Sequence, residues 1–186
     1  MNHLILPLML CAQLALAAEV AGVKVDERVK LGSSELQLNG AGLRTKAFFK
    51  VYVAGLYLSE KKTSVADVLA LPGAKRVSMR MMRQLSAKQL TDALDEGIRD
   101  NTSSAEQDAL KDRLAELTAT MNALQSAKEG DVIALDWLPG TGTRVVLNGE
   151  PRGNAIEGED FYRALLRIWL GDNPVSGSLK KSMLGG

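Results

Sequence analysis

Cysteine and histidine supply many of the nucleophiles, general bases and metal ligands of proteins. This sequence has one of each, Cys11 and His3, and both lie near the N-terminus. If that segment is removed, the remaining chain has no cysteine nucleophile, Ser-His-Asp relay, disulfide or Cys/His zinc site. Acid-base chemistry would then fall to carboxylates, lysines or tyrosines. We therefore expect no metal, no cofactor and no catalytic residue of the common nucleophilic types.

The N-terminus has the pattern of a secretory signal peptide. Leu4 to Leu16 is an almost unbroken apolar run, which Ala15–Ala17 closes as a small-x-small cleavage site. The run is too short to span roughly 30 Å of hydrocarbon. No Lys or Arg precedes it, and Cys11 leaves a lipoprotein as the lesser alternative. We expect a signal peptide over 1–17, one domain over 18–186, a periplasmic or secreted protein, and no integral membrane segment after cleavage.

The charge balance excludes several kinds of partner. Twenty-three basic and 22 acidic side chains give a formal net charge of +1. Such a balance provides no broad field that would attract nucleic acid or an anionic membrane surface. Gly140-Thr141-Gly142 lacks the lysine and following helix of a phosphate loop, so it is interpreted as a turn. We expect no nucleic-acid partner, and the sequence indicates no particular protein partner.

The strongest strand signal is Leu43 to Leu58, which contains FFKVYVAGLYL. Its β-branched and aromatic residues favour a central strand pair or one long bent strand. The Asn39-Gly40 pair just before it predicts a turn. Further strands are predicted over Val23–Leu31, Ser34–Leu38, Lys75–Arg83, Asp131–Leu138 and Thr143–Leu147, with hairpin connections at Gly32 and at 139–142.

Serine caps and apolar periodicity predict the helices. They are expected over Ser64–Leu71, from Ser86 to about Asn101, from Ser103 or Ser104 through the stripe Leu110, Leu114, Leu117, Met121 and Leu124, over Asp160–Leu170, and over Ser176–Leu184. Strands joined mainly by hairpins, with helices between and after them, predict an α+β fold. We expect a large antiparallel sheet covered on one face by a layer of helices.

Three ordered stretches resemble the chalcone isomerase-like family. GAGLRTKAFFKVYVAGLYL is similar to the family's signature strand region, and RQLSAKQLTDALDEGIRDN to its strand-to-helix junction. AIEGEDFYRALLRIWLGDNPVSGSLKKSML resembles the C-terminal helix pair. The resemblance covers roughly 23–184 and implies an open-faced β-sandwich, a large antiparallel sheet with a helix layer. Members of the family cyclise a flavonoid precursor, bind fatty acids, or assist partner enzymes.

The polar positions of the isomerases distinguish these activities. Those enzymes hold substrate with an arginine and a threonine of the signature strand, a tyrosine and an asparagine of the next helix, and a threonine or serine near the C-terminal helix. Arg44 matches the arginine, but Tyr52 replaces the threonine. Leu90 replaces the tyrosine, Gly97 the asparagine, and Ile168 lies near the last position. The resemblance therefore implies a protein that does not cyclise chalcones.

The fatty-acid-binding branch of the family pairs an arginine with a tyrosine on this strand to receive a carboxylate, and Arg44 and Tyr52 fit that role. A guanidinium donates two parallel hydrogen bonds to a carboxylate, and a phenol adds a third. On one continuous strand the two residues would share a face but lie far apart, at about 3.3 Å per residue. A bend near Thr45 to Phe48 is therefore required. Lys46 and Lys50, at alternate positions with Arg44 and Tyr52, would lie on the same face of such a strand. They are better explained as part of its solvated surface than as carboxylate ligands.

The resemblance thus implies a small amphipathic acid, such as a fatty acid, held between sheet and helices. The candidate pocket lining is Leu90, Met81, Ile168 and Trp169. Without the family argument, these residues are ordinary core, Arg44 is a surface arginine and Tyr52 is a core tyrosine.

Two alternatives remain open. An intramolecular lyase or isomerase of unknown substrate would need a second polar group with a perturbed pKa opposite Arg44. A protein-interaction module with a vestigial cleft would have a filled cavity and an exposed apolar patch.

Overall fold

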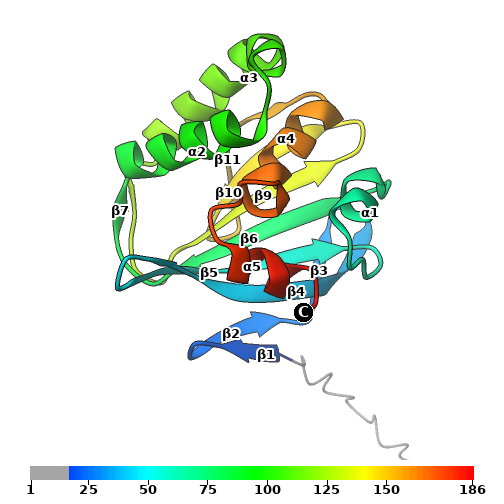
Figure 1. The fold of residues 1–186 in the computed structure, drawn as a ribbon, viewed down its shortest axis with the longest axis vertical. Coiled ribbons are helices and arrows are strands. Elements are labelled where there is room, and N and C mark those ends of the chain that lie inside the picture. The colour runs from blue at the N-terminus through cyan, green and yellow to red at the C-terminus, as the bar shows by residue number, and fades with distance from the viewer. Residues whose placement is uncertain (1–16) are drawn as a thin grey trace, which may run out of the picture.

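Strands joined by hairpins make up the larger part of the fold. The structure, a computed structural model, describes residues 17–186. Apart from Ala17, the predicted signal peptide lies outside these residues. A seven-stranded sheet in the order β11-β10-β9-β6-β5-β4-β3 has its helices on one face, which confirms the predicted α+β architecture (Figure 1). Within residues 17–186, no helix has the length and apolar character needed to cross a membrane.

All neighbouring strands of the large sheet are antiparallel. They are β3 (Arg28–Leu31), β4 (Ser34–Lys46), β5 (Phe49–Leu58), β6 (Lys75–Met81), β9 (Val132–Leu138), β10 (Gly142–Leu147) and β11 (Glu150–Ile156). Two small pairs complete the strands: β1 (Ala17–Val20) with β2 (Val23–Asp26), and β7 (Leu85–Ser86) with β8 (Ser126–Ala127). The single strand predicted over Val23–Leu31 is wrong, because the chain leaves one sheet at Asp26 and joins the other at Arg28.

Four of the five helices in residues 17–186 begin after a capping serine, as their sequences indicate, and the fourth along the chain begins after Gly158. The five are α1 (Val65–Ala70), α2 (Ala87–Asn101), α3 (Ser104–Ala123), α4 (Glu159–Leu170) and α5 (Gly177–Met183). Ser64, Ser86, Ser103 and Ser176 each accept a hydrogen bond from the backbone N–H three residues later. Such a cap satisfies an N–H group that has no partner within the helix.

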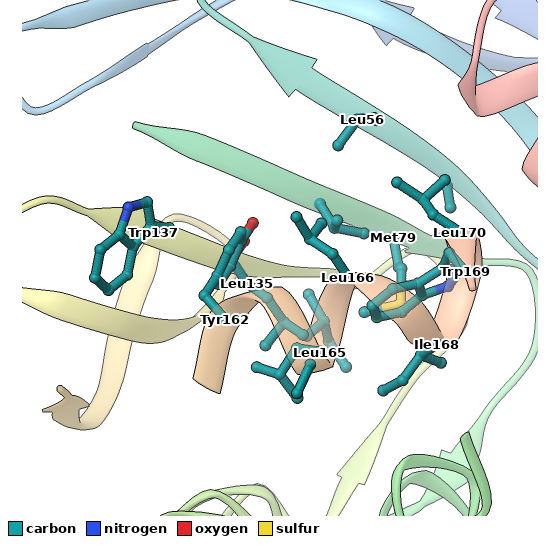
Figure 2. Close-up of a cluster of buried hydrophobic side chains, with 14 of the residues drawn as sticks. Leu56, Met79, Leu135, Trp137, Tyr162, Leu165, Leu166, Ile168, Trp169 and Leu170 are labelled. Carbon is teal, nitrogen blue, oxygen red and sulfur yellow. The ribbon is translucent and has the colours of Figure 1, made fainter. Parts of the chain in front are cut away.

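Side-chain alternation along β5 separates two apolar cores. Leu56 belongs to the core under the helices, whereas Tyr57 belongs to a smaller core under the β1–β2 hairpin on the opposite face. Helix α4 is the centre of the first core, where Tyr162, Leu166 and Trp169 lie toward the sheet and Leu165 and Ile168 toward the other helices (Figure 2). The predicted stripe of α3 is buried at Leu110, Leu117 and Met121.

The turn predicted at Asn39-Gly40 is wrong. The pair lies inside β4, at a bulge between Leu38 and Gly40. Asn39 Nδ2 donates to the carbonyls of Lys62 at 2.8 Å and Met183 at 2.7 Å, and its Oδ1 accepts from the Lys62 N–H at 2.7 Å. A Cβ on Gly40 would lie 2.0 Å from the Ser182 carbonyl oxygen. These residues therefore bring α5 against β4 instead of reversing the chain.

Replacing Gly40 with alanine should lower the free energy of unfolding by about 2 kcal/mol, because the added methyl group must displace the backbone of α5. Gly177→Ala in α5 is the matched control, since nothing lies within 4 Å of a Cβ at that position. Its stability should be unchanged or raised by up to about 1 kcal/mol. Denaturant unfolding followed by tryptophan fluorescence measures both variants. Equal stability of the two would contradict the close packing of α5 on Gly40.

Candidate functional site

The hairpin of β4 and β5 brings the two predicted ligand-binding residues together. It turns at Ala47 and Phe48, and Arg44 is directly opposite Tyr52. Residues opposed in an antiparallel pair have their side chains on one face, with Cβ atoms about 5 Å apart. The predicted bend near Thr45 to Phe48 is therefore a complete hairpin turn, and the shared face of Arg44 and Tyr52 is confirmed.

Tyr52 is held in place by a residue of the helix layer. Trp169 Nε1 donates a hydrogen bond to Tyr52 Oη at 3.0 Å. This bond leaves the phenol's own O–H free to donate to another acceptor. Burial raises the pKa of Tyr52, although the Trp169 hydrogen bond and the Arg44 charge act in the opposite direction. The phenol is therefore a neutral hydrogen-bond donor at physiological pH.

Arg44 is a half-buried cation beside this phenol. One of its terminal nitrogens donates to the carbonyl of the next residue, Thr45. Arg44 forms no ion pair with a carboxylate of residues 17–186. A guanidinium has five N–H donors, so most of them remain available to an acceptor outside the fold. The surface ion pair that composition alone suggests for this arginine is not present in the described chain.

The four predicted lining residues meet in one apolar cluster with Tyr52. Met81, Ile168 and Trp169 are buried in the core under the helices, and Leu90 packs against it from α2. Met81 is directly opposite Tyr52 on the neighbouring strand. Arg44, Tyr52 and Met81 therefore form a row across three strands, with the cation at one end and the apolar core at the other.

Tyr52 packs against the core under the helices. Two hollows stand out in the described residues, and neither is lined by Arg44 or Tyr52. One, of about 390 Å³, lies at the C-terminal ends of α2 and α4 near α1. The other, of about 90 Å³, lies between the β1–β2 hairpin and the outer face of the sheet. An open cavity with Arg44 at its polar end, as a carrier would show, is thus not found among these hollows.

The positions that carry polar groups in the isomerases here form an apolar helix contact. Gly97 of α2 packs on Ile168 of α4 so closely that a Cβ would lie 2.8 Å from the isoleucine side chain. Leu90 lies two turns earlier on α2 and packs on the same core. These three positions supply no ionisable group to the neighbourhood of Arg44.

A perturbed ionisable group does occur elsewhere on the sheet. Lys75 is only 1% exposed, and burial lowers its pKa, while Glu159 at 3.8 Å acts against that shift. Lys75 begins β6, however, whereas Met81, which lies opposite Tyr52, ends it. The lysine is therefore separated from Arg44 by the length of the strand.

Sequence reasoning missed the polar role of Trp169, which it assigned only to the apolar lining. Its partner Tyr52 is 117 residues away in the chain. No local pattern relates two residues at that separation, and only the packing of α4 on the sheet brings them together.

All three tyrosines should titrate late in the folded protein. Burial is the largest cause raising the pKa of Tyr52, Tyr57 and Tyr162, that of Tyr57 to about 12. Tyrosinate absorbance should therefore develop well above pH 10 in the native protein, and near pH 10 in denaturant. Because the unfolded chain loses these protons first, the tyrosine contribution to the free energy of unfolding falls as the pH rises above about 10. A native titration that coincides with the denatured one would contradict the burial of Tyr52.

Comparisons with known proteins agree with this architecture. The solved structure of a fatty-acid binding protein from Arabidopsis thaliana matches with a TM-score of 0.68, covering 88% of this chain and 92% of that one at 16% identity. A likeness at that identity shows a shared fold. A search of curated proteins finds no match. The family model described as chalcone isomerase-like matches residues 17–185, and the chain therefore belongs to the chalcone isomerase-like family.

Proposed function

We propose that the protein binds a fatty acid or a similar small amphipathic carboxylate between its sheet and its helices, and that it catalyses no reaction. The observation that carries this proposal is the pairing of Arg44 with Tyr52 at the edge of a buried apolar cluster. The Arabidopsis neighbour, described as a fatty-acid binding protein, supports the ligand class.

The two side chains offer the donors that a carboxylate requires. The Arg44 guanidinium would donate two charge-assisted hydrogen bonds, and the Tyr52 hydroxyl a third. Because Trp169 already donates to Tyr52 Oη, the phenol proton points to a partner other than the indole. An acyl chain extending from this point would lie against Met81 and Trp169, which are buried and apolar.

Tyr52, Met81 and Trp169 belong to one packed core, so an acyl chain entering it must displace some side chains. Helix α2 is the element suited to yield, because it packs mainly on α3 and α4 and stands away from the sheet (Figure 1). Leu90 and Leu94 of α2 are only partly buried against the core. Burial of each acyl CH₂ group contributes about 0.8 kcal/mol, which offsets the loss of those contacts.

The absence of catalysis is supported by the residues around Arg44. An isomerase or lyase on this fold would need a second ionisable group facing the arginine. Leu90, Gly97 and Ile168 provide none, and the perturbed Lys75 lies at the other end of its strand.

A protein-interaction module with a vestigial cleft is the second candidate function. Two observations favour it: neither of the two hollows described above is lined by Arg44 or Tyr52, and Phe48 and Phe49 are exposed at the hairpin turn. Failure of the wild-type protein to bind any acid would leave this candidate in first place.

Binding of palmitic acid to the purified protein, measured by native mass spectrometry and by titration, tests the first proposal. Arg44→Met should weaken binding about 10- to 100-fold, because charge-assisted hydrogen bonds are lost. The matched control is Arg80→Met, since Arg80 is exposed on β6 opposite Val53, on the other face of the sheet. The control should bind as the wild type does, and methyl palmitate should bind to none of them tightly. Equal binding by Arg44→Met and wild type would refute the assigned carboxylate site.

We also propose that the protein is exported and that residues 1–17 are removed. The apolar run Leu4–Leu16, the small-x-small site Ala15–Ala17, and a family match that begins at residue 17 support this. When the full chain is produced in a Gram-negative host, N-terminal sequencing of the periplasmic fraction should start at Ala18. A product that keeps residue 1 and remains in the cytoplasm would contradict export.

A further inference from the structure

The turn between β4 and β5 exposes two aromatic side chains. Phe48 is 100% exposed and Phe49 59%, and they are the exposed large hydrophobic residues of the described chain. The turn projects at the left edge of Figure 1, beyond the end of the β1–β2 hairpin. Phenylalanine in full contact with water is unfavourable, so two adjacent ones on a protruding turn indicate a contact surface.

The charged side chains next to the two phenylalanines are cationic. Lys46 and Lys50 flank the two phenylalanines and are exposed. The Arg83 guanidinium lies 4.6 Å from the centre of the Phe49 ring. None of these three cations forms an ion pair within residues 17–186. They and the two phenylalanines are called the hairpin tip below.

Acidic side chains are absent from the tip and from the parts of β4 and β5 that lead to it. The sequence from Leu36 to Ser59 contains no Asp or Glu. The loop beside the end of β6 holds Glu129 and Asp131, and Asp131 is engaged by the Lys128 N–H and by Asn148. The formal net charge of +1 therefore hides a local concentration of positive charge that the composition did not predict.

We propose that the hairpin tip docks on the surface of an anionic lipid bilayer. Aromatic rings are favoured at the level of the lipid headgroups, where Phe48 and Phe49 would insert. Lysine and arginine side chains are attracted to anionic lipids, so Lys46, Lys50 and Arg83 would contact the phosphates around the inserted rings. The hairpin tip therefore matches an anionic bilayer in two properties: its aromatic rings suit the interfacial layer, and its cations suit the anionic headgroups.

The size of the tip favours a lipid surface over a protein partner. A stable protein interface buries about 800 Å² on each side and has an apolar centre with a polar rim. The tip offers two apolar side chains on a convex turn, and its surroundings are cationic. A bilayer needs no matching concave surface, because its lipids rearrange around the inserted rings.

Docking at this place would put the bilayer beside the proposed ligand site. Arg44 lies two residues before Lys46 on β4, and Tyr52 lies two residues after Lys50 on the returning strand. A bound acid could then pass between the protein and the bilayer without crossing bulk water. This consequence rests on the proposed function, whereas docking itself does not.

Co-sedimentation of the chain 18–186 with vesicles tests the proposal. Vesicles of phosphatidylcholine alone are compared with vesicles that also contain phosphatidylglycerol. The wild type should bind the anionic vesicles, more weakly at high salt. Replacing both phenylalanines by serine, or changing Lys46 and Lys50 to glutamate, should each reduce binding about tenfold or more. The matched control, Lys30→Glu with Lys61→Glu, makes the same charge change at exposed residues near the opposite end of the β4–β5 hairpin and should bind as the wild type does.

The outcomes separate docking from ligand binding. The double serine variant should still bind palmitic acid, because Phe48 and Phe49 lie outside the carboxylate site. Its circular dichroism and Tm should match the wild type, since both side chains are exposed. Wild-type protein that ignores anionic vesicles, or tip variants that bind as well as wild type, would overturn the proposal. Capture of a protein by the tip without vesicle binding would overturn it in favour of a protein partner.

Discussion

The hydrogen bond from Trp169 to Tyr52 is the contact on which the geometry of the site depends. It connects helix α4 to the second strand of the β4–β5 hairpin and holds the phenol oxygen where the opposing Arg44 can share an acceptor with it. Helix α4 is fixed in turn by Tyr162, whose hydroxyl donates to the Leu135 carbonyl at 2.9 Å. The orientation of one phenol thus depends on the seating of a whole helix on the sheet.

Two glycine contacts determine how closely the helix layer approaches the sheet and itself. Gly40 lets α5 lie against β4, and Gly97 lets the C-terminal half of α2 lie against Ile168 of α4. The N-terminal half of α2 has no such contact, and its Leu90 and Leu94 are only partly buried. If the layer opens for an acyl chain, the opening is therefore expected at the N-terminal half of α2, while α4 and α5 stay in place.

Local signals in the sequence predicted the parts of this structure that local forces determine. Serine caps marked four of the five helix starts in the described chain. Arg44 and Tyr52 share a face as expected, but the reason is their pairing across the hairpin with a bulge between Arg44 and Thr45, not their spacing along one continuous strand. The Asn39-Gly40 pair led to a wrong turn prediction. The same two residue types serve here at a β-bulge, where the glycine lets helix α5 approach the strand. Strand β11 was missed because its exposed Pro151 and Gly153 are typical of loops, yet an edge strand tolerates both.

The charge state of the site bears on which ligands it would retain. Arg44 is half-buried beside an apolar cluster and has no counter-ion in the described chain, and the raised pKa keeps Tyr52 neutral. A neutral lipid would leave that cation uncompensated, while a free inorganic anion would leave the apolar cluster unused. A ligand that combines an anionic group, such as the proposed carboxylate, with an apolar tail would satisfy both parts of the row from Arg44 to Met81. The same combination describes a molecule that partitions into bilayers, which is where a cationic, aromatic hairpin tip would place this site.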